Sequence, residues 1–177
     1  MTSVSEKTAK HYITAFIIAL AGVILDQLSK YMAVHFLQGT DGIDLIPGVF
    51  RLTYLENRGA AFGLLQGQQA VFLVIAIAVM AAAVYGVWRM PPERKYIPLY
   101  LCAVGLVSGA AGNMIDRLAQ GYVVDFFYFC LIDFPVFNVA DCYVTLSVAV
   151  LALTILFYYR DQDLEPFSLR RQKGEIR

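Results

Sequence analysis

The sequence is poor in the residues that most enzymes use for nucleophilic or metal chemistry. Its 177 residues include only two histidines, His11 and His35, and three cysteines, Cys102, Cys130 and Cys142. The odd number of cysteines and their spacing match no zinc site, so we interpret them as small apolar packing residues. There is no Gly-x-Ser-x-Gly motif, and neither histidine has a suitable serine or cysteine partner. We therefore expect no catalytic triad, no metal and no cofactor.

Charged residues are also scarce, at 16% of the chain, whereas hydrophobic residues reach 59% and the mean hydropathy is +0.60. An ordinary soluble domain has about 45–50% apolar and about 25% charged residues. The 14 basic and 14 acidic residues balance, so no basic excess indicates a nucleic-acid partner. The composition predicts a protein that crosses the membrane several times.

Four segments are apolar over the roughly 20 residues that a membrane-spanning helix requires. They lie at about residues 12–34, 69–88, 96–115 and 139–159. The first follows Lys7 and Lys10 and contains the triplet Ala19-Leu20-Ala21, as a signal peptide could. Because its apolar run continues past this triplet, we predict that it is not cleaved.

Lysine and arginine residues are distributed unevenly among the connections. Four lie on one side of the predicted membrane: Lys30, Arg51, Arg58 and Arg117. The other ten lie in the amino terminus, in the second connection and in the tail. The positive-inside rule then places both termini in the cytoplasm. An even number of spans agrees with this orientation.

The predicted fold is an all-α membrane protein with a small extracytoplasmic β element. We expect one four-helix domain over residues 1–160 and a polar cytoplasmic tail over residues 161–177, near anionic headgroups or simply solvated. The outward connections, at about 35–68 and 116–138, would form most of the extracytoplasmic face.

Both outward connections contain strand-like stretches. Gly48–Glu56 follows a Pro-Gly turn signal and alternates in the way of a half-buried strand. Tyr122–Ile132 and Val136–Val139 are rich in aromatic and β-branched residues, and we expect them to join or cover the resulting sheet.

Ionisable residues at membrane depth are costly and indicate function by default. Asp26 and Lys30, near the outer end of the first span, are four residues apart and can form a structural ion pair or position the substrate or the backbone. In the segment Glu56–Gly63, Asn57 offers two donors and one acceptor, and Gly59 permits close approach or a positive φ. A simple turn would also explain this second segment.

The third span carries small residues followed by polar ones. Three glycines share one helical face and allow close contact between helices in lipid: Gly105, Gly109 and Gly112. Asn113, Asp116 and Arg117 follow within a turn, and Asn113 and Arg117 project from nearly the same face. Arg117 can balance nearby carboxylates or complement the carbonyl end of its own helix.

Two aspartates bracket the second outward connection. Asp125 stands between valine and three aromatic residues, where neither a strand nor lipid favours a carboxylate. Asp141 lies at the start of the fourth span, where Asn138 can cap the helix and the dipole favours negative charge. Helix capping alone would therefore explain Asn138 and Asp141. Asp133 is interpreted as a loop charge.

Two neighbouring carboxylates can share one proton, because like charges raise the pKa of one of them. One group then acts as a base toward water while the other donates a proton to a carbonyl oxygen. We expect Asp141, near a helix amino terminus, to be the more acidic and Asp125 the more often protonated. Hydrolysis by an aspartate pair is the chemistry that these residues best allow.

A small proton-coupled carrier is the alternative from another class, because carboxylates inside a membrane can relay protons. Such a carrier needs polar residues at depth on both sides of the membrane. Here the polar residues gather toward the outward ends of the spans, which argues against transport. A structural membrane subunit would leave Asp125 unexplained.

Five motifs together resemble those of bacterial lipoprotein signal peptidases, or signal peptidase II, a family of aspartic membrane peptidases. They are Asp26-Gln-x-Ser-Lys30, Glu56-Asn57-x-Gly-Ala-Ala-Phe-Gly63, Gly112-Asn113-x-x-Asp116-Arg117, Val124-Asp125-Phe126 and Phe137-Asn138-x-Ala-Asp141. They occur in the family's order and cover nearly all of the four-span core. Ser108 stands where the family often has a further glycine.

The resemblance implies that Asp125 and Asp141 are the catalytic pair, near the outer surface of the bacterial cytoplasmic (inner) membrane. It implies that the following residues support the pair or hold the substrate: Asp26, Asn57, Asn113, Arg117 and Asn138. To these we add Lys30, Gly59 and Asp116 from the same motifs. The implied substrate is a prolipoprotein cut on the amino side of its diacylglyceryl-modified cysteine. Membrane lipids and cyclic peptide inhibitors such as globomycin are the other expected partners, and we expect a monomer.

Overall fold

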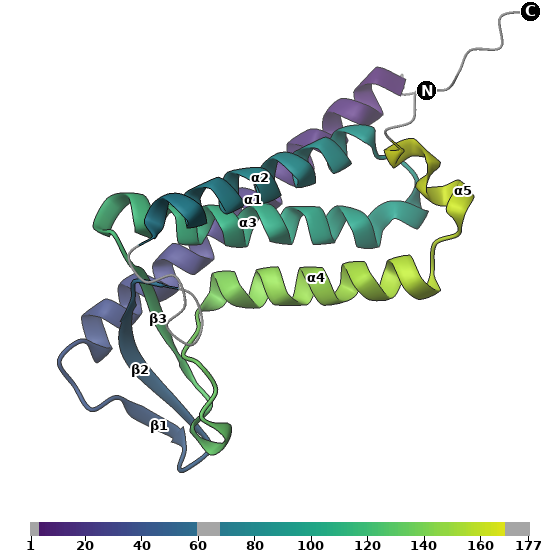
Figure 1. Ribbon diagram of the computed structural model, residues 1–177. Coiled ribbons are helices and arrows are strands. Elements are labelled where there is room, and N and C mark those ends of the chain that lie inside the picture. Colours follow the sequence, from purple (N-terminus) through teal and green to yellow (C-terminus); the bar gives the residue numbers. More distant parts are fainter. Residues whose placement is uncertain (1–3, 60–67, 169–177) are drawn as a thin grey trace, which may run out of the picture.

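The computed structural model describes residues 4–59 and 68–168, with side chains from Lys10 onward. Most of the described chain is helical, and a small sheet extends from one end of the helices (Figure 1). The long helices are α1 (Val4–Leu37), α2 (Gln69–Arg89), α3 (Ile97–Gln120) and α4 (Val139–Phe157). The strands are β1 (Ile43–Ile46), β2 (Phe50–Asn57) and β3 (Val123–Tyr128).

All four predicted spans are confirmed as helices long and apolar enough to cross a membrane. Two of them continue further toward the sheet than the apolar runs indicated, α1 to Leu37 and α3 to Gln120. The polar residues Asn113, Asp116 and Arg117 therefore lie within the last turns of α3. This helix ends where Gly121 adopts a φ of 81°, a left-handed conformation that glycine reaches without steric cost.

Helix α3 lies at the centre of the bundle and packs against α1, α2 and α4. Its span is far more buried than those of the other three helices, which present apolar side chains to the outside, as helices in lipid do. The predicted close contacts at its glycines are confirmed. A side chain on Gly105, Gly109 or Gly112 would collide with Ser147, Ala140 or Asp26, respectively.

The sheet is antiparallel, with strand order β1-β2-β3. Strand β2 confirms the alternating stretch in the first outward connection, and β3 lies within the aromatic stretch of the second. The Val136–Val139 stretch contributes only an isolated bridge between Phe127 and Phe137 and then the start of α4. Strand β1 was not predicted. It pairs with β2 across Ile43 and Leu52, and all four of its residues are exposed.

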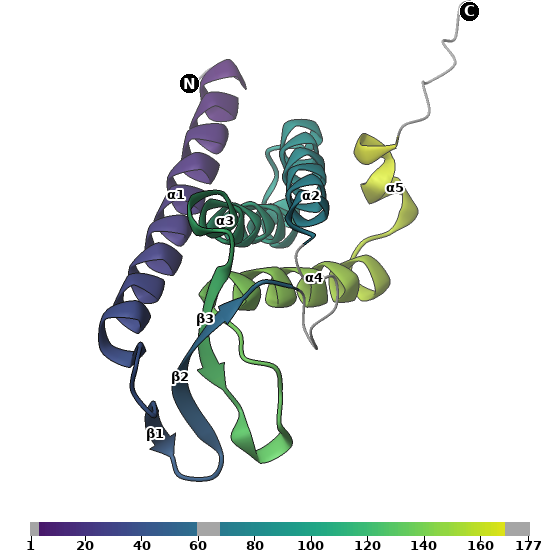
Figure 2. The ribbon, with the colours of Figure 1, turned by 60° about the vertical axis from the view of Figure 1, so that its left-hand side comes forward.

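The sheet is joined to α1 by an apolar cluster of Ala33, Leu37, Val124 and Phe126. Since successive strand residues face opposite sides, Val124 and Phe126 pack toward α1 while Asp125 between them faces the other way. Figures 1 and 2 show that the sheet extends away from the start of α1 and from α5. The molecule thus has a helical end and a sheet end.

Residues after α4 fold back onto the bundle. A short helix, α5 (Asp161–Leu164), and a 3-10 turn, η4 (Glu165–Phe167), occupy part of the segment expected to be a polar tail. The Tyr96 hydroxyl donates to the Asp163 carbonyl oxygen over 2.9 Å, and Lys95 pairs with the Asp163 carboxylate. The predicted tail arginines beyond residue 168 lie outside the described residues.

Candidate active site

Asp125 lies on β3 and Asp141 on α4. The end of the second predicted outward connection brings the two residues together. Asp125 occupies the middle of β3 and is only 1% exposed, although strands disfavour aspartate. Asp141 lies in the first turn of α4. The backbone of Phe137 bonds to Phe127, which fixes the start of α4 against β3.

Asn138 connects the two carboxylates directly. Its side-chain amide donates to Asp125 Oδ1 over 2.6 Å, and its backbone N–H donates to Asp141 Oδ2 over 3.1 Å. Its Oδ1 accepts from the Asp141 backbone N–H over 3.0 Å, so Asn138 is also the predicted cap of α4. The capping role is therefore confirmed, and it coexists with a bridge between the two aspartates.

Two further asparagines complete the bonding of the pair. Asn57, the last residue of β2, donates from Nδ2 to Asp125 Oδ2 over 2.7 Å. Asn113, on α3, donates from Nδ2 to Asp141 Oδ1 over 2.8 Å. Both oxygens of each aspartate thus accept from an N–H group, an arrangement that holds the two carboxylates at fixed orientations.

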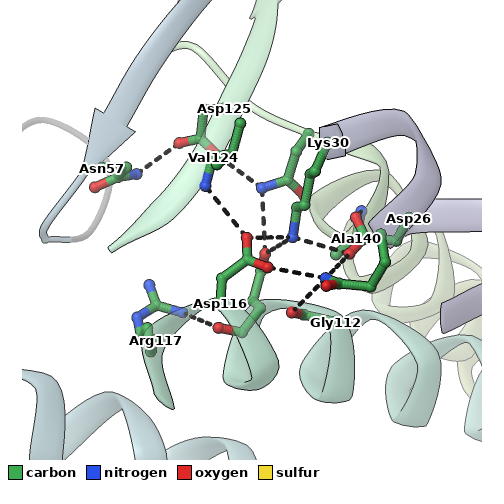
Figure 3. Close-up of polar contacts among 12 residues, drawn as sticks. Asp26, Lys30, Asn57, Gly112, Asp116, Arg117, Val124, Asp125 and Ala140 are labelled. Atoms are coloured by element: carbon green, nitrogen blue, oxygen red, sulfur yellow. Dashed lines mark hydrogen bonds and ion pairs between the residues drawn. The ribbon is translucent and has the colours of Figure 1, made fainter. Parts of the chain in front are cut away.

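A buried charge network lies beside the pair, between α1 and α3 (Figure 3). Lys30 Nζ is 2.9 Å from Asp26 Oδ2 and 3.0 Å from Asp116 Oδ2, and all three residues are at least 96% buried. The network confirms the predicted ion pair of Asp26 and Lys30 and adds Asp116 to it. Because one cation serves two carboxylates, the network carries a net charge of −1 when all three groups are ionised.

The network also binds the backbone at both aspartates. Asp26 Oδ1 accepts from the Ala140 N–H over 2.9 Å, next to Asp141, and Asp116 Oδ2 accepts from the Val124 N–H over 3.2 Å, next to Asp125. Figure 3 shows these contacts converging from the helices and the sheet. The network therefore anchors the backbone that carries each member of the pair.

Gln27 was not singled out from the sequence. Its amide donates to Asp116 Oδ1 over 2.8 Å and to Asp26 Oδ2 over 3.2 Å. Only its position beside Asp26 in the first motif could have indicated this role. It contacts the charge network but none of the three asparagines.

A cavity of about 590 Å³ opens beside Asp141. Most of its lining residues are apolar, and together they are Asn57, Gly59, Phe72, Arg117, Phe134, Pro135, Val136, Phe137, Asp141, Cys142, Thr145 and Leu146. Asp141 thus faces a space large enough for a small ligand or a short peptide segment.

Arg117 lies on the wall of this cavity. Its guanidinium donates to the carbonyl oxygens of Asn113 and Gly59, each over 3.4 Å, and its Cζ lies 4.5 Å from the centre of the Phe72 ring. The direct contacts of Arg117 are thus with two carbonyl oxygens and an aromatic ring, and its two predicted roles remain predictions. No pattern in the sequence indicates Phe72, because a single aromatic residue in an apolar span is common.

The glycine motif after β2 is described only in part. Asn57 Oδ1 accepts from the Gly59 N–H over 3.0 Å, which forms the predicted turn and orients the Asn57 amide. The predicted residues from Ala60 to Gly63 lie outside the described residues. Asp133 is exposed and accepts from the Tyr128 hydroxyl over 2.7 Å, as expected of a loop residue.

Burial raises the pKa of Asp125 to about 7, and the negative charge of Asp141 adds to the rise. Hydrogen bonds from Asn57 and Asn138 and the positive charge of Lys30 oppose it. Asp125 can therefore hold a proton near neutral pH, which a donor to a carbonyl oxygen requires. Within the described ranges, no group of three or more histidine, cysteine, aspartate or glutamate residues could hold a metal ion.

Four apolar helices, together with a buried Asp125 and a half-buried Asp141 joined through Asn138, define a membrane protein equipped for acid–base hydrolysis. Comparison with known families specifies the class further. The family model described as "Signal peptidase (SPase) II" matches residues 18–157. The chain belongs to the signal peptidase II family and is an aspartic membrane peptidase.

Individual relatives agree with this assignment. Lipoprotein signal peptidases of Clostridioides difficile and Brevibacillus brevis are 43% and 41% identical to the chain, over 80% and 79% of it and 93% of each relative. Two solved bacterial membrane enzymes, at 2.3 Å and 1.9 Å resolution, superpose with TM-scores of 0.72 and 0.70 at 31% and 33% identity. They cover 90% and 82% of this chain, which in turn covers 94% of each.

Proposed function

We propose that Asp125 and Asp141 are the catalytic residues with which this peptidase removes signal peptides from prolipoproteins. Cleavage would fall on the amino side of the diacylglyceryl-modified cysteine. The observation that carries the proposal is Asn138, which donates to both carboxylates, buried Asp125 and half-buried Asp141, and Asp141 lines the cavity. Relatives with 40–43% identity are named lipoprotein signal peptidases, which supports the same substrate class.

The mechanism needs one ionised and one protonated carboxyl group. Ionised Asp141 takes a proton from water, whose oxygen attacks the scissile carbonyl carbon, while protonated Asp125 donates its proton to the carbonyl oxygen. The tetrahedral intermediate collapses when Asp141 returns a proton to the leaving nitrogen and Asp125 recovers one from a hydroxyl of the intermediate. The C–N bond breaks, and both groups regain their starting protonation states.

Activity should therefore fall as the pH rises through about 7, because Asp125 loses the proton it must donate. Since the two aspartates titrate as a pair, the profile reports values that belong to both. A rate that stays constant across this range would contradict a proton shared by the pair.

The cavity suits a substrate that is part peptide and part lipid. Apolar side chains such as Phe72, Val136 and Leu146 form much of its wall, and Asp141 and Asn57 lie at its polar edge. Acyl chains could remain among the helices while the peptide bond reaches the carboxylates. A cyclic lipopeptide of the globomycin type would compete for the same space.

We infer that the protein lies in the bacterial cytoplasmic (inner) membrane as a monomer, with both termini in the cytoplasm and the active site toward the extracytoplasmic side. The uneven distribution of lysine and arginine supports this orientation. The carrier alternative receives no support from the family. In the described spans the buried charges Asp26, Lys30 and Asp116 all lie at the sheet end.

The test is turnover of a diacylglyceryl-modified precursor by purified protein in detergent or lipid. Asp125→Asn and Asp141→Asn should each lower the rate by at least about 10³-fold while the protein still inserts, since each removes an acid–base group and damages the shared site. Asp133→Asn is the matched control, because it removes an exposed aspartate of the same connection. Wild-type rates for either variant of the pair would refute the proposal.

A further inference from the structure

The three asparagines around the aspartates must hold their amides in one of two orientations. An asparagine side chain ends in an acceptor oxygen and a donor NH₂ group, and only the NH₂ group can bond to an ionised carboxylate. In each of the three, Nδ2 faces Asp125 or Asp141. The orientation of each amide therefore depends on which group contacts its oxygen.

Each oxygen faces a donor. The oxygen of Asn57 accepts from the Gly59 backbone, and that of Asn138 accepts from the Asp141 backbone. The oxygen of Asn113 instead accepts from a side chain, Lys30 Nζ, over 2.8 Å. Asn138 Nδ2 also donates to this oxygen, over 3.2 Å, with its second hydrogen, but the bond from Lys30 is the shorter of the two.

A lysine ammonium group donates hydrogen bonds and cannot accept any. If the Asn113 amide turned over, its NH₂ group would face Lys30 and its oxygen would face the Asp141 carboxylate. Both contacts would then be repulsive. Lys30 itself cannot move away easily, because Asp26 and Asp116 hold it at 2.9 and 3.0 Å in a site where it is only 3% exposed.

We infer that Lys30 is a positioning residue, which fixes the Asn113 amide so that it always donates to Asp141. The inference rests on the proposed function and adds to it a reason for a buried lysine beside the pair. An isolated ion pair with Asp26 would stabilise α1 without acting on the chemistry. The bond to Asn113 extends the effect of Lys30 to the orientation of Asp141, the proposed base.

Lys30 also contributes charge, so the experiment must separate charge from orientation. The charged groups around the pair are Asp26 and Lys30 from α1, Asp116 and Arg117 from α3, and Glu56 and Arg58 at the end of β2. Lys30→Met alone leaves the network at −2. Combined with Asp116→Asn, it restores the original −1 and still removes the bond from Lys30 to Asn113.

The central variant is therefore Lys30→Met with Asp116→Asn, assayed on the lipid-modified precursor. We expect kcat to fall about 10²-fold with KM within about threefold of wild type, because a misoriented catalytic group costs rate more than binding. Lys30→Met alone should in addition shift the alkaline limb of the pH profile upward, since it removes a positive charge near Asp125. Lys30→Arg, which keeps a donor-only cation, should recover most of the rate.

Gln27→Met is the matched control, because it removes partly buried hydrogen bonds to the same two carboxylates and to the Gly112 carbonyl oxygen without touching an asparagine side chain. It should lower the melting temperature but leave kcat within about threefold. A similar kcat for this control and for the Lys30 double variant would overturn the inference. If Asp125→Asn retained turnover, the proposed function itself would fail, so the two failures are distinguishable.

A double-mutant cycle covers the case in which the double variant does not fold. Asn113→Leu removes the amide, and Lys30→Gln leaves a neutral partner that no longer requires the Asn113 oxygen. If Lys30 acts through Asn113, Lys30→Gln should lower kcat in the wild type by about tenfold and have little further effect in Asn113→Leu. Additive losses would show a separate structural role and would overturn the inference.

Discussion

At the scale of single residues, the site depends on side chains that serve two purposes. Asn138 caps α4 and also donates to Asp125, and it is completely buried. Asp141 completes the capping box while its other oxygen accepts from Asn113. Since one set of atoms fixes both the helix and the carboxylates, the proposed catalytic geometry is as rigid as the start of the helix.

Asp125 makes folding stability depend on pH. Its pKa in the folded protein, about 7, exceeds the ordinary value of 3.8, so the folded state holds a proton that the unfolded state has released. The contribution of this proton to the stability of the folded state is fully present below about pH 4 and is lost as the pH rises through about 7. We expect the melting temperature to fall between pH 5 and pH 8, and to fall less in Asp125→Asn.

Asp133→Asn is the control for that experiment, because it makes the same substitution at an exposed position. Its melting temperature should follow the wild-type pH dependence. If Asp125→Asn showed the same dependence as the wild type, ionisation of Asp125 would not be what weakens the fold.

At this scale, the sequence singles out a residue most clearly when no structural role explains that residue. Asp125 stood out because a strand among aromatic residues has no use for a carboxylate. Asp141 was harder to identify, since capping alone would explain it. The bridge by Asn138 could not be predicted, because it depends on how β3 and α4 meet in space, and no spacing along the chain records that.

At the scale of elements, the pair depends on how closely α4 approaches α3. A Cβ atom on Gly109 would lie 2.4 Å from the carbonyl oxygen of Ala140 and 2.7 Å from a methyl group of Val144. The carbonyl belongs to the backbone beside Asp141, so it cannot move without shifting the start of α4. The spacing of the two helices is thus part of the site.

Gly109→Ala should therefore destabilise the protein by about 1–3 kcal/mol, as overpacking does, and lower turnover by displacing Asp141. Thermal unfolding in detergent and the precursor assay measure the two effects. Gly86→Ala on α2 is the matched control, because nothing lies within 4 Å of its Cβ position. It should leave turnover unchanged and stabilise the helix by up to about 1 kcal/mol. Equal behaviour of the two variants would mean that the α3–α4 contact tolerates a methyl group.

Long apolar helices were the elements most readily predicted, because length and composition determine them. Strand β2 was recognisable from its alternation, whereas β1 is an exposed edge strand of four residues whose pairing depends on the hairpin. Residues Asp161–Phe167 appeared polar enough for a free tail. Their contacts with Tyr96 and Lys95 are long-range, and no local pattern indicates them.

At the scale of the whole molecule, the two ends differ both in the charges they carry and in the elements that form them. The described basic residues Arg89, Arg94, Lys95 and Arg160 lie at or beyond the helix ends away from the sheet. The buried charge network and Asp125 lie next to the sheet, and Asn138 joins Asp141 to Asp125. The proposed cleavage outside the cell requires the sheet end to face outward, and the positive-inside rule predicts the same orientation.

Labelling of introduced cysteines tests this orientation. Asp41→Cys, before β1, and Glu93→Cys, between α2 and α3, are both exposed and lie at opposite ends of the molecule. With a membrane-impermeant maleimide on right-side-out vesicles, Asp41→Cys should react at once and Glu93→Cys only after the membrane is opened. A parent chain carrying Cys130→Ser sets the background, since Cys130 lies in the connection predicted to face outward and is only partly buried. Labelling of Glu93→Cys in sealed vesicles would show the opposite orientation. The aspartates would then lie on the side from which prolipoproteins are exported, where cleavage after translocation could not occur.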